Sequence, residues 1–497
     1  MRAAPTSSLV GVQLLALCTV VLLALPWLNP LGFGPSPWVV QTLLTLLCAS
    51  TAAVGLMALP PALRVRVCIA AWVLAAALSS LMGLLQYAGM SDAWYPWVSV
   101  TRAGEAFANL RQRNQFATLT AIGLAALVWG GTAWSEWGRA GMVGRGLLVA
   151  LLAFGNAASA SRTGLVEMLL IATLALGWRR RSGNEGSTDA LRLGGLALLC
   201  YAAAALVLPA LAGLDAHGSG ILGRWQDHSP ACASRLTLWS NVLHLIGQKP
   251  WTGWGWGELD YAHFITLYPG ARFCDILDNA HNLPLHLAVE LGVPVALAAC
   301  GLGLWLVLRA RPWAEADPVR QLAWAVLAVL GLHSLLEYPL WYGPFQLAAV
   351  LSIGMLLQSR WTFGPAASTI SGIGATVCIA VGGWAAWDYH RISQIYIAPA
   401  QRAAAYRDNT LQKIRASWLF ASQVRFAELG ITPLTPDNAA YQLDLSRDML
   451  HFSPEQRVAQ RVVDSAALLG LNEEAAFYRQ RLQAAFGGAE ADPTATQ

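Results

Sequence analysis

The sequence predicts an all-α polytopic membrane protein with about eleven transmembrane helices. Of its 497 residues, 56% are hydrophobic and only 12% are charged, and the mean hydropathy is +0.47. A soluble globular chain usually carries about 25% charged residues. Apolar runs of about 20 residues recur along most of the chain, and each is long enough to cross about 30 Å of hydrocarbon. Many of the 22 tryptophans flank these runs, where interfacial tryptophans are enriched.

The apolar runs define the predicted membrane spans. They cover residues 9–28, 37–58, 66–88, 115–134, 143–159, 163–178, 191–212, 283–308, 320–338, 343–359 and 368–387. The fifth and sixth spans are short, and only the segment "SASRTG" separates them.

Arginines in the connecting segments predict the orientation, because cytoplasmic loops carry an excess of Lys and Arg. With the N-terminus inside, the cytoplasmic loops hold Arg64, Arg66, Arg139, Arg145, Arg179, Arg180, Arg181, Arg192, Arg309, Arg311, Arg320 and Arg360. The outside turns 29–36 and 339–342 hold none. The net charge of +4 therefore reflects topology and gives no reason to expect nucleic acid as a partner.

Four parts follow from these spans. Residues 1–212 are predicted to be N-terminal transmembrane helices, residues 213–282 a large outside loop, and residues 283–388 C-terminal transmembrane helices. Residues 389–497 are charged and amphipathic, which predicts a helical domain outside the membrane. That domain resembles a tetratricopeptide unit, although no repeat of about 34 residues is found. The sequence leaves open whether it binds a partner or only packs.

The stretch "SPEQRVAQRVVDSAALLG" predicts one helix of that domain. Ser453 is the expected N-cap, Pro454 the first helical residue and Gln456 the partner in a capping box. Gly470 is expected to end the helix.

Two cysteines lie in the outside loop, Cys232 and Cys274, whereas most of the other six lie in apolar spans. An oxidising compartment would allow the two to pair. The sequence leaves both a disulfide and two separate thiols possible.

Several arginines are on the side of the membrane where the topology rule does not expect them. An arginine at membrane depth is costly unless it pairs or faces water, and a guanidinium recognises phosphate through two parallel hydrogen bonds. Arginines at one level of the outer leaflet would bind a lipid pyrophosphate head group; the alternative is that they pair with carboxylates or extend to the interface. The residues are Arg102, Arg111, Arg113, Arg162, Arg224, Arg235 and Arg272.

His281 lies in "DNAHNLPLH", at the start of a predicted span, after Asp278 and beside Asn282. Histidine can accept and release a proton near neutral pH, and a nearby carboxylate can orient it. His281 is therefore a candidate general base. His286 lies about 140° further around a helix, so both side chains cannot line one narrow face, and His286 is predicted to be structural.

The glycine-rich stretch "PWTGWGWGELDYAHF" is not predicted to bind phosphate. It lacks the lysine and Ser/Thr of a Walker loop and has no βαβ context. A tight turn anchored by tryptophan is expected instead. The acidic residues Asp227, Glu258, Asp260, Asp275 and Asp278 show no firm ligand spacing, so no metal is expected to be required.

Four stretches together resemble the O-antigen ligase superfamily of bacterial inner-membrane glycosyltransferases. They are "RQRNQFATLTAIGL", "SASRTGL", "SRLTLWSNVLHLIGQKPWTGWGWGEL" and "DNAHNLPLHLAVELGVP". The last two carry R-x-x-x-W, P-x-x-G-x-G, and H-N followed by E-x-G. The stretch "LEYPLWYGPFQLAAVLSIGML" and the C-terminal domain further resemble the protein O-oligosaccharyltransferases, or pilin glycosylation ligases.

This resemblance implies a GT-C-like membrane fold in the bacterial inner membrane, with the loop and the C-terminal domain in the periplasm. It implies transfer of a glycan in one step from undecaprenyl pyrophosphate to a Ser or Thr hydroxyl of a periplasmic protein such as pilin. His281 would be the base, and Arg162 and Arg235 would hold the pyrophosphate. The anomeric centre would invert, and no cofactor is implied. The further candidates for substrate binding are Arg113, Arg111, Asn114, Asn282, Asp278, Arg224 and Arg272.

Other acceptors remain open for the same chemistry. Lipid A core sugar would make the protein an O-antigen ligase, and a second repeat unit would make it a polymerase. A lipid or solute transporter is a more distant alternative, since Glu167 lies in the sixth span but no inverted repeat is found.

Overall fold

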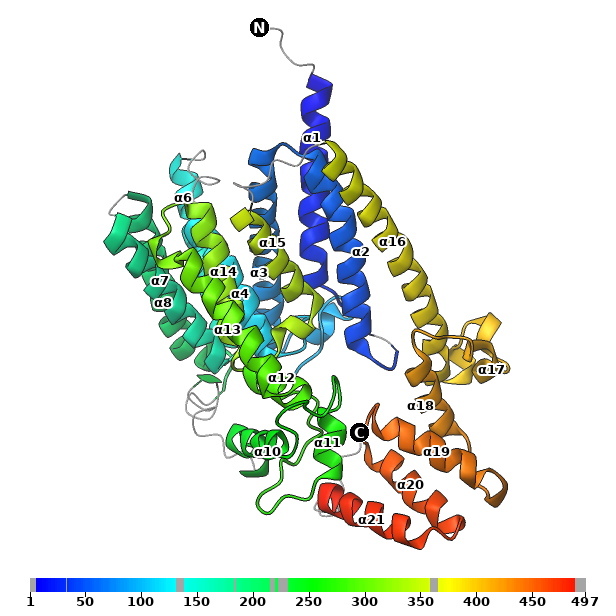
Figure 1. Ribbon diagram of the computed structural model, residues 1–497. Coiled ribbons are helices and arrows are strands. Elements are labelled where there is room, and N and C mark those ends of the chain that lie inside the picture. Colours follow the sequence, from blue (N-terminus) through cyan, green and yellow to red (C-terminus); the bar gives the residue numbers. More distant parts are fainter. Residues whose placement is uncertain are drawn as a thin grey trace. The chain divides into compact units, whose positions relative to one another are not determined.

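The computed structural model describes residues 6–32, 34–130, 138–182, 185–214, 220–221, 231–357 and 365–487. All regular elements in these ranges are helices, with no strand among them, which confirms the all-α prediction (Figure 1). Of the predicted site residues, Arg224 lies outside the described ranges.

The chain forms two compact units, which are described separately. The first comprises Met1–Gly32, Ser36–Asp227 and Val307–Trp384, and the second Phe33–Pro35, His228–Leu306 and Ala385–Gln497.

The first unit is a bundle of long apolar helices. They are α1 (Thr6–Ala24), α2 (Pro37–Ala58), α3 (Pro61–Tyr87), α4 (Arg113–Trp129), α6 (Gly138–Ala158), α7 (Arg162–Ser182), α8 (Glu185–Leu211), α14 (Pro318–Ser334), α15 (Gly343–Leu357) and most of α16 (Pro365–Ser393). Its 3-10 turns are η1 (Leu25–Trp27), η2 (Ser91–Trp94), η4 (Pro312–Ala314) and η5 (Pro339–Trp341).

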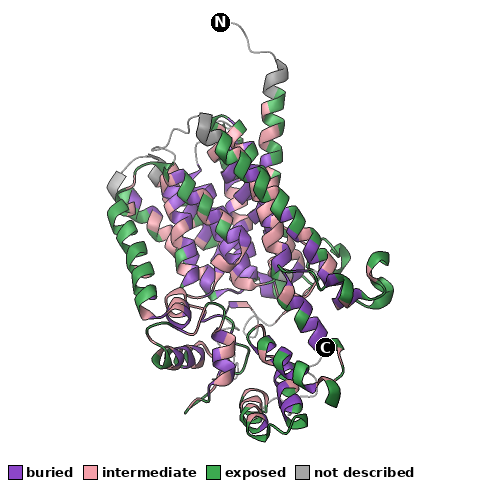
Figure 2. Cartoon of the chain, turned by 45° about the vertical axis from the view of Figure 1, so that its right-hand side comes forward, coloured by how far each residue is buried: buried purple, intermediate pink, exposed green. Residues whose placement is uncertain are grey.

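Helix α4 is the centre of this bundle. Every residue from Gln115 to Trp129 is buried, and the helix packs against α3, α6, α7 and α14. At Gly123 a Cβ atom would lie 2.4 Å from the Cβ of Ala76, so α3 and α4 approach more closely than a larger residue would allow. Small residues at such contacts are typical of membrane helix packing. Figure 2 shows the buried residues gathered in the interior of the bundle.

Seven of the described helices are long and apolar enough to cross a membrane. They include α1, α2, α3, α6 and α8, together with α13 (Val293–Ala310) and α16. The other predicted spans, α4, α7, α14 and α15, are also helices, and α15 is apolar but shorter. The chain is therefore a polytopic membrane protein, and the number of spans stays a prediction.

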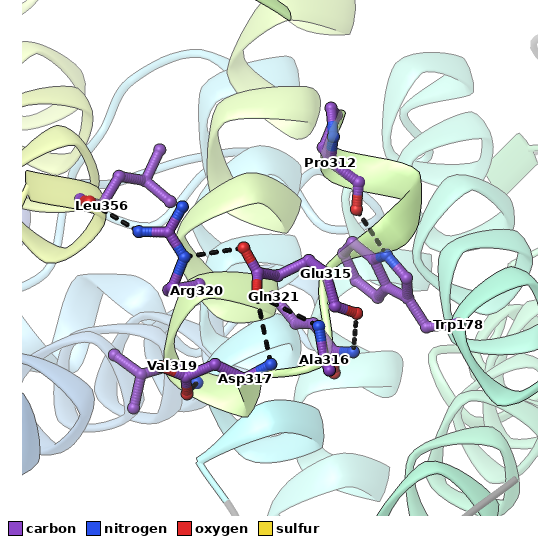
Figure 3. Close-up of polar contacts among 9 residues, drawn as sticks. All are labelled: Trp178, Pro312, Glu315, Ala316, Asp317, Val319, Arg320, Gln321 and Leu356. Carbon is purple, nitrogen blue, oxygen red and sulfur yellow. Dashed lines mark hydrogen bonds and ion pairs between the residues drawn. The ribbon is translucent and has the colours of Figure 1, made fainter. Parts of the chain in front are cut away.

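Polar bonds tie the ends of three helices together at one end of the bundle (Figure 3). Arg320 pairs with Glu315 at 2.7 Å, and its Nη1 donates to the carbonyl of Leu356 at the end of α15. The indole N–H of Trp178 in α7 donates to the carbonyl of Pro312 at 2.8 Å. These bonds anchor the start of α14 to its neighbours α7 and α15.

The second unit contains shorter helices. They are α10 (Arg235–Gln248), α11 (Leu259–Ile265), α12 (Leu283–Leu291), the first part of α13, α17 (Thr410–Ile414), α18 (Ala421–Ile431), α19 (Ala439–Leu450), α20 (Gln456–Leu468) and α21 (Asn472–Phe486). Its 3-10 turns are η3 (Ala231–Ala233), η6 (Gln394–Tyr396), η7 (Pro399–Gln401), η8 (Ala404–Tyr406) and η9 (Pro436–Asn438).

In this unit the C-terminal helices share a core with the loop that precedes α12. Phe264 of α11 is buried among apolar side chains of α18–α21. Glu258, just before α11, pairs with His451 at 2.6 Å, and the His451 ring stacks on Tyr261 at 3.8 Å. Arg481 Nε donates to the carbonyl of Ile265 at 2.8 Å. The C-terminal domain therefore packs on the loop, and partner binding by this domain stays a prediction.

Two predicted helix boundaries are wrong. The single span expected over 283–308 is two helices, α12 and α13, which are separated at Gly292 with φ +88. Helix α20 begins at Gln456, and its N-cap is Glu455, where Ser453 was expected. The N–H of Glu455 is bonded to the carbonyl of Ser453, so Ser453 belongs to the turn before the helix.

Candidate active site

In the second unit, the segments before Arg235 and before His281 are joined by a disulfide bond. Cys232 pairs with Cys274, three residues before Arg235 and seven before His281. The sequence allowed this bond but did not require it. The disulfide holds the start of α10 beside the segment that leads to α12.

Helix α10 carries the R-x-x-x-W motif, and the tryptophan of this motif contacts the segment that carries H-N. The indole N–H of Trp239 donates to the carbonyl of Ala280 at 3.1 Å, immediately before His281. The Asn241 side chain, also on α10, accepts the N–H of Phe273 at 2.8 Å. Leu238 and Val289 meet in the core between α10 and α12. The segments that carry Arg235 and His281 are thus bonded to one another.

The P-x-x-G-x-G and E-x-G motifs are joined by backbone hydrogen bonds. The N–H groups of Trp254 and Gly255 donate to the carbonyls of Val289 and Glu290 at 2.9 and 3.0 Å. In return, the N–H of Val293 donates to the carbonyl of Pro250 at 2.8 Å. These bonds satisfy the backbone where the helix breaks.

Gly292 and Gly253 allow this backbone-to-backbone contact. A Cβ at Gly292 would lie 2.3 Å from the carbonyl oxygen of Trp251, and one at Gly253 would lie 2.3 Å from that of Glu290. The expectation of a tight turn in place of a phosphate loop agrees with this geometry.

His281 has a left-handed backbone, with φ +50, which is uncommon for residues other than Gly but less so for Asn, Asp and His. Its N–H donates to Asn279 Oδ1 at 2.9 Å. Asn282 follows as the N-cap of α12, where its Oδ1 accepts the N–H of Leu285 at 3.1 Å. His281 thus precedes the helix, so the expectation that it shares a helix with His286 is wrong. Its side chain is only half-buried and remains accessible.

His286 is buried behind His281. Burial, and then the charge of His281, lowers the pKa of His286 to about 4, so it is neutral at pH 7. Its Nε2 lies 3.4 Å from Glu290. The geometry therefore agrees with a structural role for His286.

Asp278, which lies near the candidate base, belongs to a cluster of acidic side chains. Loss of surrounding water raises the pKa of Asp278, and the nearby charge of His281 acts in the opposite direction. The pKa of Glu290 is raised to about 7 by burial, although the backbone N–H groups of Gly257 and Leu259 bind its carboxylate. The pKa of Asp260 is also raised to about 7, first by burial and then by its acidic neighbours, among them Asp278.

Asp260→Asn is expected to stabilise the protein more at pH 8 than at pH 5. The folded-state pKa of Asp260 is above its ordinary value of 3.8, so the stability that its protonated form contributes is lost as the pH rises from about 4 to about 7. Asparagine removes that loss, and the gain at pH 8 over pH 5 is about 2 kcal/mol. Thermal unfolding in detergent at both pH values measures it. The exposed Asp437→Asn is the control, and an equal effect of Asp260→Asn at both pH values would contradict the prediction.

In the first unit, the predicted site residues lie at the starts of α4 and α7. Arg113 begins α4 and pairs with Glu105 at 2.6 Å. Arg111 Nη2 donates to the carbonyl of Pro30 at 3.3 Å. Arg162 begins α7, is exposed, and has no hydrogen bond or ion pair with any residue that the structure describes. Of these arginines, Arg162 is the one whose guanidinium is available to a ligand.

Asn114 forms a structural bridge. Its Nδ2 donates to Glu337 at 2.9 Å, and its Oδ1 accepts the hydroxyl of Ser161 at 2.7 Å. Its direct binding of substrate stays a prediction.

Arg272, in the second unit, is also held by the protein. Its Nη1 donates to the carbonyl of Thr266 at 3.0 Å, and its guanidinium lies over the Tyr268 ring, 5.6 Å from the centroid. Among the described ranges, no three His, Cys, Asp or Glu side chains converge as metal ligands would.

Three of the candidate arginines share one position, the first residue of a helix. Arg113, Arg162 and Arg235 begin α4, α7 and α10. The preceding residue caps each helix: the side chains of Gln112, Ser161 and Ser234 each accept a backbone N–H from the first turn. A cation at a helix N-terminus is disfavoured by the helix dipole. An anion bound there is stabilised by the helix dipole and by the arginine together. The first turns of α4, α7 and α10 contain no acidic residue.

The sequence did not single out Glu337, Glu290 or Trp239. Glu337 was visible as an acid near the end of the predicted span 320–338, in "LEYPLWY", and Trp239 as the tryptophan of R-x-x-x-W. Their partners, Asn114 and Ala280, are far away in the chain, so only the structure reveals these roles.

Three family models match the chain. Residues 147–300 match "O-Antigen ligase", residues 106–129 match "Protein glycosylation ligase", and residues 321–497 match "Virulence factor membrane-bound polymerase, C-terminal". The second covers all of α4, and the first spans α7, α10 and α12.

Two curated proteins of Acinetobacter baylyi (strain ATCC 33305 / BD413 / ADP1) are similar. A general O-oligosaccharyltransferase is 28% identical over 134 residues, 26% of this chain and 22% of the relative. A ComP-specific O-oligosaccharyltransferase is 26% identical over 242 residues, 49% of this chain and 42% of the relative. Each match thus spans less than half of the relative's length. By these matches, and by the motifs that the fold holds together, the chain is similar to the O-antigen ligases and to the protein glycosylation ligases.

Proposed function

We propose that the protein is an O-oligosaccharyltransferase. It transfers a glycan as one block from undecaprenyl pyrophosphate to a Ser or Thr hydroxyl of a periplasmic protein such as pilin. The similarity to the O-antigen ligase family model and the names of the two Acinetobacter relatives support glycan transfer.

The observation that carries the proposal is the placement of arginine at the first position of capped helices. Arg162 and Arg235 lie where a helix N-terminus and a guanidinium both attract an anion. Each of these helix starts by itself suits a pyrophosphate that gains charge as it departs. Arg113 contributes less, because Glu105 already neutralises it.

In the proposed mechanism, His281 takes the proton of the acceptor hydroxyl. The hydroxyl oxygen attacks the anomeric carbon, the bond from that carbon to the pyrophosphate oxygen breaks, and the electron pair leaves with the pyrophosphate. Arg162 and Arg235 stabilise the departing charge. Asp278 and its acidic neighbours stabilise the imidazolium that forms. A single displacement inverts the anomeric centre, and no metal or cofactor is needed in this scheme.

The proposed location is the bacterial inner membrane, with the loop 213–282 and the C-terminal domain 389–497 in the periplasm. The arginine distribution between spans supports this orientation. The Cys232–Cys274 disulfide is a second support, because such bonds persist in oxidising compartments.

A second acceptor is favoured by one specific finding. The match of residues 321–497 to the C-terminal region of a membrane-bound polymerase allows the same chemistry with a sugar hydroxyl as acceptor. Transfer to lipid A core is the corresponding O-antigen ligase reaction.

Purified protein with undecaprenyl-pyrophosphate-linked glycan distinguishes these activities. Offered separately a pilin-type protein, a lipid A core acceptor and no acceptor, the enzyme is expected to glycosylate the protein, which mass spectrometry of the intact acceptor detects. Glycan on the lipid A core alone would make it an O-antigen ligase, and longer lipid-linked glycan would make it a polymerase. Intact donor in all three reactions would reject glycan transfer.

A further inference from the structure

A partly buried chain of hydrogen bonds crosses the first unit between α4, α7 and the end of α14. Glu337 Oε1 accepts the Nδ2–H of Asn114 at 2.9 Å, and Asn114 Oδ1 accepts the hydroxyl of Ser161 at 2.7 Å. The Ser161 oxygen in turn accepts the N–H of Gly164 at 3.0 Å. Glu337, at 4% exposure, is a buried carboxylate, and burying a charge is costly unless it is well bonded.

Each member of the chain lies next to a candidate arginine or to the turn that ends α14. Asn114 directly follows Arg113 at the start of α4, and Ser161 caps α7 directly before Arg162. Glu337 lies three residues after the end of α14, where its N–H is bonded to the carbonyl of His333 at 2.7 Å. One carboxylate therefore connects the two helix starts that carry these arginines.

The carboxylate also sets the direction of every bond in the chain. A carboxylate only accepts, so Asn114 must turn its NH₂ towards Glu337 and its oxygen towards Ser161. Ser161 must then donate to Asn114, which leaves its lone pair for the N–H of Gly164. An acceptor at one end thus fixes the cap of α7 at the other.

We propose that Glu337 is a positioning residue for the lipid pyrophosphate donor. Through Asn114 and Ser161 it sets the separation and orientation of the helix starts that carry Arg113 and Arg162. This role rests on the proposed function.

A second layer of polar bonds joins the same three helices deeper in the bundle. The Thr118 hydroxyl donates to Glu167 at 2.6 Å and lies 2.8 Å from His333 Nδ1. Thr118 is one turn below Asn114 on α4, and His333 is four residues before Glu337. Because these side-chain bonds do not include the side chain of Glu337, side-chain changes in the upper chain are expected to leave the bundle folded.

A charge exchange between two positions tests the proposal. Asn114→Asp places two carboxylates face to face, and its KM for undecaprenyl-pyrophosphate-linked glycan is expected to rise about tenfold, with the acceptor KM unchanged. Adding Glu337→Gln replaces the facing carboxylate with an amide, whose NH₂ donates to the introduced aspartate while that aspartate still accepts from Ser161. The double variant is therefore expected to return to within about threefold of wild type, a coupling that independent sites do not show.

The control variant is Gln346→Ala, which removes the bond from Gln346 Nε2 to the carbonyl of Leu340 in the neighbouring η5 turn. It is expected to keep the wild-type donor KM. Thermal unfolding in detergent is measured for each variant, and Asn114→Asp is expected to melt below wild type and below the double variant.

If wild type transfers glycan, two results would overturn the positioning role of Glu337 alone. One is a normal donor KM in Asn114→Asp, and the other is a donor KM that does not recover in the double variant. A wild-type protein that uses no lipid pyrophosphate would instead reject the proposed function and this role with it. Even without activity, a higher melting temperature in the double variant than in Asn114→Asp would show that positions 114 and 337 are hydrogen-bonded.

Discussion

His281→Ala is expected to lower glycan transfer by at least about a hundredfold, the contribution typical of a general base. The side chain is half-buried and lies before α12, outside the helix, so its loss leaves no cavity in the core between α10 and α12. The variant is therefore expected to remain folded in the membrane. Initial rates with saturating lipid-linked glycan and acceptor protein measure the loss, and size-exclusion chromatography with thermal unfolding checks the fold.

Two further variants separate the ring from the backbone. His281→Asn retains a residue that tolerates the left-handed backbone at φ +50 but cannot act as the base, so it is expected to be as inactive as the alanine variant. His390→Ala removes an exposed histidine of α16 in the same unit and is expected to retain full activity. Wild-type kcat/KM is expected to require a deprotonated group, and this requirement is expected to be absent from both His281 variants. Undiminished transfer by His281→Asn would exclude His281 as the base.

Hydropathy alone located the long apolar helices, because a membrane span needs only a long apolar run. It failed at Gly292, where one predicted span is two helices. The break is stabilised by bonds from Trp254 and Gly255 to the carbonyls of Val289 and Glu290, about 35 residues away in sequence. Periodicity and composition do not reveal such pairing.

The candidate site was predictable as a set of residue types, but their partners were not. Arginines on the outside indicated anion binding, and His281 beside acids indicated a base. Whether an arginine is available depends on its neighbours: Arg113 pairs with Glu105, whereas the exposed Arg162 has no such partner among the residues that the structure describes. The Cys232–Cys274 bond likewise depends on the fold that brings the two segments together.

Arg235→Ala is expected to lower kcat with the lipid-linked donor by about 10²- to 10³-fold, the loss seen when one preorganised donor to a developing negative charge is removed. Arg235 is the first residue of α10, after the Ser234 cap and the Cys232–Cys274 disulfide. A cation at this position opposes the helix dipole, so its removal is expected to leave the melting temperature unchanged or slightly higher. Loss of activity without loss of stability is the result that a ligand-binding arginine predicts.

Arg235→Lys distinguishes forked recognition from charge alone. Lysine keeps the charge but not the planar pair of donors, so it is expected to recover only part of the lost rate. Arg479→Ala, which removes an exposed arginine of α21 in the same unit, is the control and is expected to behave as wild type. Inhibition by undecaprenyl pyrophosphate is also expected to weaken in Arg235→Ala and to persist in His281→Ala, because the arginine binds the leaving group and the histidine binds the acceptor proton. Equal inhibition of both variants by undecaprenyl pyrophosphate would contradict that division of roles.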